Sequence, residues 1–335
     1  MRWTLLVVAV FLLCLPERPW GQTTAPTISS VSGTPVSGTS ITINGSLLVN
    51  EDTSHYDAWF TTHPHASGME GASPSADGWW DSGLHEGVYV TDVKLTGPQS
   101  GKLHLAATGS SQDAGEAFYF TPTLTNYYLR AYLRLHRNSA TGWPLNQFKL
   151  IGQYGSDVKI LAPARNEWPT EWNMYYGGSN HWYNNPFGNI VADRWFCVEW
   201  YMSSSAWTVW IDGVQLGSGG TGATGGWLEF GIFDTDGPSG LSMDAYYDNM
   251  ATGSARLYPL STVEIGNSAT YATATKRYQA PTLLSDGQVQ VTCDLTGLGS
   301  GPYYLWVTNN RQQRSAAIPL SATSAPAAPS NVVIR

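Results

Sequence analysis

The chain has 335 residues, a formal net charge of −8 and only 13% charged residues. So few charges argue against a long solvated helix, a coiled coil or a disordered acidic tail, and the acidic balance without a basic run argues against nucleic acid or an anionic membrane as a partner. The 15 Trp, 18 Tyr and 35 Gly instead favour an all-β protein that presents aromatic rings to a ligand.

The first segment, residues 1–21, is predicted to be a signal peptide. Arg2 gives it a positive start, and the apolar run 5–15 is too short to cross a bilayer but suits a signal-peptide core. Pro16 ends the run, and cleavage is expected near Gly21. Since no later stretch is long and apolar enough to span a membrane, we expect a secreted, extracellular protein.

The rest of the chain predicts strands and almost no helix, because alternating or β-branched and aromatic runs are separated by Gly, Asn, Asp, Ser and Pro. Asp212-Gly213 is a hairpin signal, since both turn positions need a positive φ. The expected strands span residues 39–43, 103–107, 127–136, 148–154, 172–176, 195–202, 207–211, 227–233, 245–251, 289–294 and 303–309.

Two cysteines follow the predicted signal peptide, Cys197 and Cys293. Export would permit a disulfide, but each cysteine stands in the middle of a predicted strand, in what we interpret as different domains. We therefore expect two buried free thiols. No Cys/His spacing resembles a zinc site.

The composition changes in sections, and the length allows about two domains. Residues 22–50 are small, polar and β-branched without a ring, residues 56–257 hold nearly all the Trp, and residues 260–322 return to the first style. The last stretch, residues 323–335, reads as a Pro/Ala/Ser linker and tail.

The two ends share one resemblance. Residues 26–33 (PTISSVSG) and 38–46 (GTSITINGS) resemble the opening of an IPT/TIG domain, an immunoglobulin-like β-sandwich, and its closing Gly-rich strand resembles residues 297–309 (GLGSGPYYLWVTN). The first piece is too short to bury a core of its own. We interpret the ends, residues 22–55 and 258–322, as one IPT/TIG-like sandwich split by an insertion.

The insertion, residues 56–257, carries a second resemblance. It contains in order the segments LTGPQSGKL (95–103), YYLRAYLRLH (127–136), WFCVEW (195–200), WTVWIDGV (207–214) and YYDNM (246–250). This series resembles a concanavalin A-like jelly roll, in the style of sandwich-fold polysaccharide lyases and laminin-G-like lectin domains. The fold class expected is therefore all-β, with a jelly-roll β-sandwich and a smaller immunoglobulin-like β-sandwich.

Alternation along residues 127–136 separates an apolar face from a polar one. The apolar residues must pack between the sheets, so the other set should face outward, on what the resemblance implies is the concave, ligand-holding sheet. Rings stack on the apolar faces of pyranoses, and guanidinium and amide groups bond hydroxyls or grip a uronate. The groove residues expected from this strand and the next are Tyr128, Arg130, Tyr132, Arg134, His136, Gln147, Lys149 and Gln153.

The tract 174–187 (MYYGGSNHWYNNPF) is interpreted as an aromatic loop. Tyr175 and Trp182 at its tip would form a sugar platform. A loop that folds its rings over a sheet edge would account for the same residues.

The leading function is binding of an extracellular polysaccharide on the concave jelly-roll face. A glycoside hydrolase is not expected, because Glu199 and Glu229 stand alone and the paired carboxylates of a retaining enzyme are absent. A structural or surface-assembly protein is a further alternative, in which the IPT/TIG-like domain or the tail 331–335 (NVVIR) contacts a second subunit.

A polysaccharide lyase is the enzymatic alternative. β-Elimination from a uronate needs a group that neutralises the carboxylate and a base/acid pair. The family motifs match only in part, because Arg130-Ala-Tyr-Leu-Arg134 lacks the central Glu and Gln147-Phe-Lys149 has Lys for His. If the chain is a lyase, the candidate catalytic residues are Arg130, Tyr132, Arg134, Gln147 and Lys149.

Three aspartates are candidates for a structural calcium ion, which the jelly-roll resemblance implies. Asp234 and Asp236 stand in a DTDG turn, and Asp248 follows a pair of tyrosines. Carboxylate oxygens are ligands that calcium takes, but turn chemistry accounts for the same residues. No other cofactor is expected.

Overall fold

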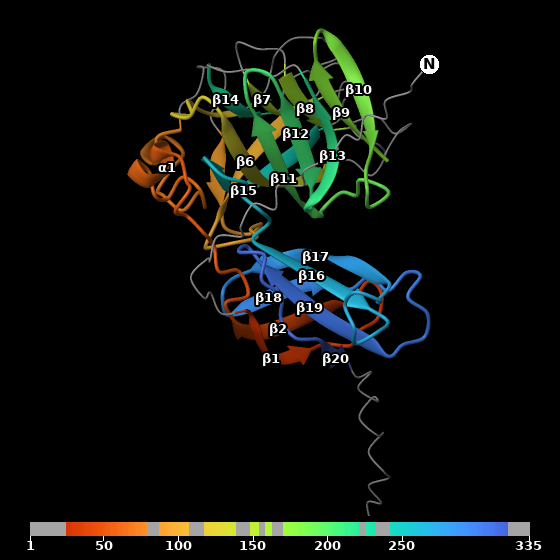
Figure 1. Cartoon of the computed structure of the whole chain (residues 1–335). Coiled ribbons are helices and arrows are strands. Elements are labelled where there is room, and N and C mark those ends of the chain that lie inside the picture. Colours follow the sequence, from red (N-terminus) through yellow and green to blue (C-terminus); the bar gives the residue numbers. More distant parts are fainter. Residues whose placement is uncertain are drawn as a thin grey trace, which may run out of the picture.

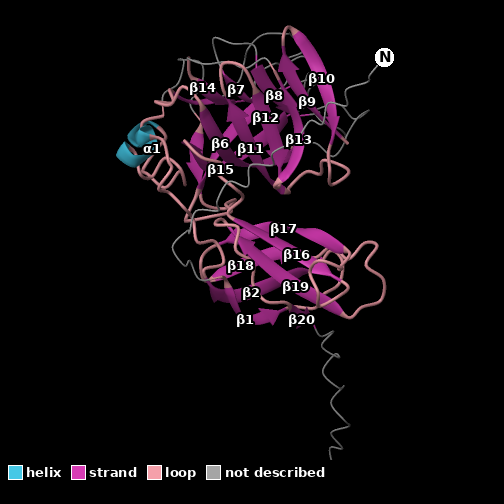
Figure 2. Cartoon of the chain, viewed as in Figure 1, coloured by secondary structure: helices cyan, strands magenta, loops and turns pink. Residues whose placement is uncertain are grey.

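The structure is a computed structural model that describes residues 25–79, 87–106, 117–138, 148–153, 158–162, 170–220, 226–231 and 242–320. These residues form almost entirely antiparallel strands, grouped in two sandwiches that lie one below the other in Figure 1 and are coloured by secondary structure in Figure 2. The larger is a jelly roll and the smaller is immunoglobulin-like, which confirms the expected fold class. The predicted signal peptide and the tail 323–335 lie outside the described residues.

The small sandwich is built from both ends of the described chain. Its strand order is β1-β2-β18-β17-β16-β19-β20. Residues 276–279 of β17 pair with β16 and residues 280–284 pair with β18, so β17 belongs to both layers. The family assignment of this sandwich to IPT/TIG stays a prediction. Its strands are β1 (Thr27–Ser32), β2 (Ser40–Ser46), β16 (Ser261–Gly266), β17 (Lys276–Leu284), β18 (Gln288–Thr292), β19 (Tyr303–Asn309) and β20 (Ile318–Leu320).

The jelly roll consists of two sheets in the described part of the chain. The distal sheet has the order β10-β9-β8-β7-β14-β5, with β5 (Ala117–Phe120), β7 (Phe148–Gln153), β8 (Val158–Ala162), β9 (Glu171–Tyr176), β10 (Ser179–Asn184) and β14 (Leu228–Gly231). The proximal sheet, which contacts the small sandwich, has the order β13-β12-β11-β6-β15-β4-β3. Its strands are β3 (Val88–Val90), β4 (Ser100–Ala106), β6 (Tyr127–Arg137), β11 (Trp195–Met202), β12 (Trp207–Ile211), β13 (Val214–Gly219) and β15 (Ser242–Gly253).

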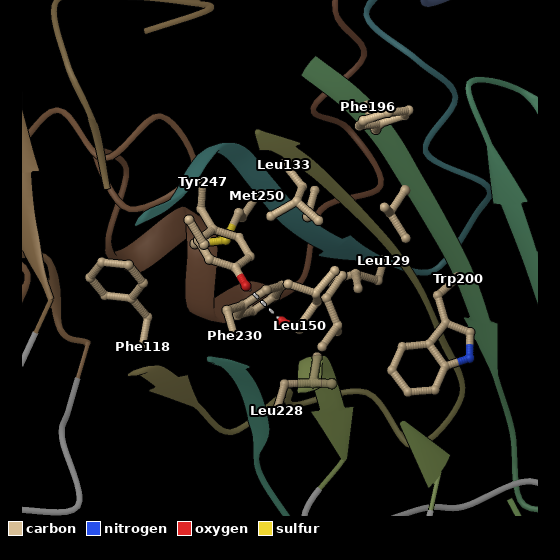
Figure 3. Close-up of a cluster of buried hydrophobic side chains, with 14 of the residues drawn as sticks. Phe118, Leu129, Leu133, Leu150, Phe196, Trp200, Leu228, Phe230, Tyr247 and Met250 are labelled. Atoms are coloured by element: carbon tan, nitrogen blue, oxygen red, sulfur yellow. Dashed lines mark hydrogen bonds between the residues drawn. The ribbon is translucent and has the colours of Figure 1, made fainter. Parts of the chain in front are cut away.

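The core between the two sheets follows from alternation along the strands. Leu129 and Leu133 of β6 are fully buried against Phe230 of β14 and Leu150 of β7 (Figure 3). Full burial of such a side chain stabilises the fold by about 1.5–3 kcal/mol. The buried hydroxyl of Tyr247 donates to the Leu150 carbonyl at 2.8 Å, so this polar atom is satisfied inside the core. A short helix, α1 (Ala58–Thr62), and a 3₁₀ turn at Ser75–Asp77 lie beside the sandwich.

Two local predictions have different outcomes. The hairpin at Asp212-Gly213 is confirmed, with φ of 50° and 83° between β12 and β13. The interpretation of residues 174–187 as a loop is wrong over most of its length, because β9 and β10 pair there as a hairpin. Gly177 and Gly178, with φ of 58° and 76°, form its turn. Among the described residues, no helix has the length and hydropathy needed to cross a bilayer.

The outward face of the proximal sheet forms an apolar interface with the small sandwich. Trp195 and Cys197 of β11 and Tyr246 of β15 belong to the same buried cluster as Val289 and Cys293 of the small sandwich. Both cysteines are buried and unpaired, which confirms the prediction of two free thiols. The small sandwich therefore covers part of the face on which a ligand groove was expected.

Candidate functional site

The residues that were expected to line one groove lie on two opposite sheets. Arg134 and His136 belong to β6 of the proximal sheet, whereas Lys149 and Gln153 belong to β7 of the distal sheet. Tyr175 is on β9, also in the distal sheet. The single groove inferred from the sequence is therefore wrong.

Arg130 and Tyr132 are buried beneath the small sandwich and do not face a ligand. Neither side chain is more than 1% exposed. The Arg130 guanidinium donates to the Glu51 carboxylate and, at 2.6 Å, to the Tyr56 hydroxyl. The Tyr132 hydroxyl accepts from the Leu260 backbone N–H at 2.8 Å. The expected ligand contacts of these two residues are replaced by contacts that hold the sandwiches together.

Arg134 and His136 remain partly exposed, but they share one carboxylate. Arg134 donates to Asp193 at 2.8 Å, and His136 Nδ1 lies 2.8 Å from the same oxygen. Further pairs between acidic and basic side chains join β15 and β4. They were not predicted from the sequence, although alternation in both strands places their side chains on this face. There, Asp244 lies 3.0 Å from Lys102 and 2.6 Å from His104. Each basic side chain of this group therefore already has a carboxylate partner. We call the group the proximal polar patch; it consists of Lys102, His104, Arg134, His136, Asp193 and Asp244.

Gln153 points into the jelly-roll core, which corrects its predicted place in a groove. It is 1% exposed and accepts a hydrogen bond from the Tyr127 hydroxyl. The cause is an irregularity in the pairing of β7 with β8 between Lys149 and Ile151. Such a bulge shifts the alternation by one residue, so Leu150 and Ile151 both face the core. Gln147 and the side chain of Lys149 lie outside what the structure describes.

The outward face of the distal sheet gathers polar and aromatic side chains at its β9–β10 end. Trp172 and Met174 are fully buried in the core, so Asn173 and Tyr175 between and after them face outward. Trp182 of β10 pairs directly with Asn173 and therefore lies on the same face. Both Tyr175 and Trp182 are half-buried. We call Asn173, Tyr175 and Trp182 the distal triad.

A row of backbone positions crosses the distal sheet from the triad to the opposite edge. Tyr175 pairs with Lys159, Lys159 with Gly152, Gly152 with Glu229, and Glu229 with Tyr119. Glu229 and Tyr119 are both at least nine-tenths buried, although they face away from the core. Gly152, which has no side chain, thus lies in the middle of this row, and a tyrosine lies at each end of it.

Asn173 is the most unusual side chain of this face. It has no exposed surface, and neither its Oδ1 nor its Nδ2 has a hydrogen-bond partner among the residues that the structure describes. Leaving a buried polar group unsatisfied costs about 1–3 kcal/mol, so native proteins rarely do so without a functional reason. Asn173 was not predicted from the sequence, because an Asn in a strand cannot be distinguished from a solvated outward residue until its burial is known.

Asp248 does not have the role expected for a calcium ligand. Its carboxylate is fully buried and accepts from the backbone N–H groups of Leu95 and Thr96, at 2.8 and 3.0 Å, and from the Thr96 hydroxyl at 2.5 Å. Burial raises the pKa of Asp248 to about 7, against the effect of the Thr96 hydrogen bonds. The other calcium candidates, Asp234 and Asp236, lie outside the described residues. Within the described ranges, His, Cys, Asp and Glu form no group of three that could hold a metal.

No protein-family model and no curated protein sequence matches this chain. Solved structures that resemble it include the cellulose-induced protein Cip1, with 15% identity, a TM-score of 0.40, and coverage of 54% of this chain and 93% of that one. A Bacillus licheniformis β-glucanase has 11% identity over 47% and 79% of the two chains, with a TM-score of 0.35. The alginate lyase AlyC3 has 7% identity over 46% and 74%, with a TM-score of 0.34.

Proposed function

We propose that the chain is an extracellular protein that binds a polysaccharide on the outward face of its distal sheet. The observation that supports this most is Asn173, a buried amide whose donor group and acceptor have no hydrogen-bond partner in the described part of the chain. A sugar hydroxyl can both donate and accept a hydrogen bond. Two neighbouring hydroxyls can therefore satisfy an amide, one by donating to its oxygen and the other by accepting from its NH2 group.

The neighbours of Asn173 supply the second half of sugar recognition. The half-buried rings of Tyr175 and Trp182 lie on the same face. Pyranose rings carry C–H groups that stack on aromatic faces, while a few polar groups fix their orientation. The row to Tyr119 would extend such a site across the sheet, far enough for more than one sugar unit. The proximal polar patch is the poorer site, because its cations already have carboxylate partners.

Affinity electrophoresis tests this proposal. The protein is run through native gels that contain alginate, glucuronan, pectin or mixed-linkage β-glucan, and binding appears as retardation. We expect Tyr175→Ala and Trp182→Ala to weaken retardation by a polymer that retards the wild type. Arg134→Ala, on the proximal polar patch, and Tyr304→Ala, a half-buried ring of the small sandwich, serve as controls that keep it. Equal loss in the controls, or none in the triad variants, would reject the site.

The same face favours one second candidate, a polysaccharide lyase. An amide such as that of Asn173 can hydrogen-bond a uronate carboxylate, and Tyr175 on the same face is the candidate base that takes the C5 proton. The electron pair of the C5–H bond then forms the C4–C5 double bond, the C4–O bond breaks, and the C4 oxygen leaves with the proton that Tyr175 took from C5. Incubation with the uronate polymers, read at the ultraviolet absorbance of the unsaturated product, tests this candidate. No rise in absorbance with a polymer that binds would leave binding as the function.

A further inference from the structure

A second group of aromatic side chains lies on the proximal sheet, beside the connection between the two sandwiches. Tyr128 of β6 and Tyr201 of β11 pair in register, with ring centroids 4.7 Å apart. Trp210 of β12 and Tyr258 of the connection flank Arg256, whose guanidinium carbon lies 4.1 and 4.5 Å from their ring centroids. All five side chains are half-buried. We call these five residues the proximal platform.

The guanidinium group of Arg256 is fixed by a buried carboxylate. Its Nε and Nη2 donate to the Glu199 carboxylate at 2.7 and 3.3 Å, and Glu199 is only 1% exposed. The Nη1 group has no partner in the described part of the chain, so its hydrogens remain available. An arginine fixed by a bidentate carboxylate and by two rings loses little further entropy when it binds a ligand.

The three tyrosine hydroxyls of the platform are also available to a ligand. The hydroxyls of Tyr128, Tyr201 and Tyr258 have no hydrogen-bond partner among the described residues. They come from three separate segments of the chain, and burial raises the pKa of Tyr128, which Arg256 opposes. The contact of the Tyr128 and Tyr201 rings and the contacts of Arg256 with Tyr258 and Trp210 place these side chains on the same outward face of the proximal sheet.

From this arrangement we infer that the proximal platform is a second carbohydrate-binding site, specific for neutral pyranose units. The aromatic rings of the platform can stack on the C–H faces of a sugar. The three tyrosine hydroxyls and the Nη1 group of Arg256 can form hydrogen bonds with the hydroxyls of the sugar. Arg256 and Glu199 cancel in charge, as do Arg130 and Glu51 beside them, so the platform has no net charge that would require an anionic sugar.

The inference extends the proposed function and rests on it for the class of ligand. The distal triad and the proximal platform lie on opposite sheets of one sandwich, so a short oligosaccharide cannot contact both. One protein chain would then hold two polysaccharide chains, or two stretches of one long chain. A binder with two sites cross-links a long polymer, which a binder with one site does not.

The test measures binding and cross-linking together, with the full chain. Binding is retardation in native gels that contain mixed-linkage β-glucan, galactomannan, alginate or pectin, and cross-linking is light scattering of the same polymer in solution. The platform variants are Tyr201→Ala and Trp210→Ala, the triad variants are Tyr175→Ala and Trp182→Ala, and Tyr304→Ala is the control. Tyr201→Ala keeps both rings that contact Arg256, so it tests the platform if Trp210→Ala fails to fold.

The two-site inference predicts that a neutral polymer retards and scatters with the wild type and the control. Either set of variants should weaken retardation by about tenfold in dissociation constant and abolish scattering. Platform variants that keep full retardation and scattering would overturn the inference and leave the proposed function intact. Loss confined to the platform variants would support the platform and reject the distal site. No retardation by any of the four polymers would reject both.

Discussion

The Arg130 guanidinium donates to the Glu51 carboxylate at the point where the chain leaves the small sandwich, and Arg130 has no exposed surface. The same guanidinium donates to Asn249 of β15 and, at 3.3 Å, to the carbonyl of Tyr258, where the chain returns. Both crossings between the sandwiches thus meet at one buried cation. This arrangement fixes the small sandwich against the proximal sheet.

Removal of the counter-charge should therefore destabilise the whole molecule. Glu51→Gln leaves the buried cation of Arg130 without a carboxylate, and breaking a buried pair in this way costs about 3–5 kcal/mol in the free energy of unfolding. Urea denaturation followed by tryptophan fluorescence measures it. Asp193→Asn, which removes the exposed partner of Arg134, is the matched control and should cost less than about 1 kcal/mol. Equal effects of the two substitutions would contradict the account.

Asp248 should make stability depend on pH in a definite direction. Because burial raises its pKa in the folded state to about 7, from 3.8, the folded protein holds a proton that the unfolded chain has lost between about pH 4 and 7. Stability contributed by this group is therefore complete below about pH 4, falls as the pH rises towards 7 and is constant above it.

Asp248→Asn isolates that contribution, because an amide cannot titrate and its oxygen can still accept from Leu95 and Thr96. The free energy of unfolding, measured from pH 4 to 8, should fall more steeply in the wild type than in the variant. Parallel curves for the two proteins would show that Asp248 does not titrate in this range.

Cys197 should report whether the sandwiches separate. It lies in the buried cluster between them, and burial raises the pKa of its thiol well above the usual range. In a variant with Cys14 and Cys293 replaced by Ser, a thiol reagent at pH 8 should label Cys197 at least about a thousandfold more slowly than in denaturant, as for an opening that costs ~4 kcal/mol. Rapid labelling of the folded protein would show that the interface opens readily.

The sequence predicted the strands well, because residue alternation and turn residues determine the backbone conformation of only a few neighbouring positions. The turn at Asp212-Gly213 is an example, because its two positive φ values are required by the hairpin itself. The faces of the strands were harder to assign. Nothing in residues 127–136 distinguishes a polar face that meets solvent from one that meets another sandwich, so Arg130 could not be recognised as buried.

The site residues were harder still to predict, because their positions depend on contacts between segments that are far apart in the sequence. One irregularity after Lys149 turned Gln153 from the predicted outward position into the core, and a bulge leaves no reliable mark in the sequence. Tyr175 and Trp182 were predicted as ligand contacts, and that role stays a prediction. Asn173 between two core residues became notable only through its burial and its lack of partners, which are tertiary properties.

The proposed function requires that Asn173 serves a ligand and not the fold, and the substitution Asn173→Leu tests this requirement. Leu branches at the same carbon as Asn but has no polar atoms to leave unsatisfied. We predict that the free energy of unfolding rises by about 1–3 kcal/mol, while retardation in a polysaccharide gel that retards the wild type is weakened by about tenfold in dissociation constant. A substitution that lowers stability, or one that leaves polysaccharide binding unchanged, would contradict the account.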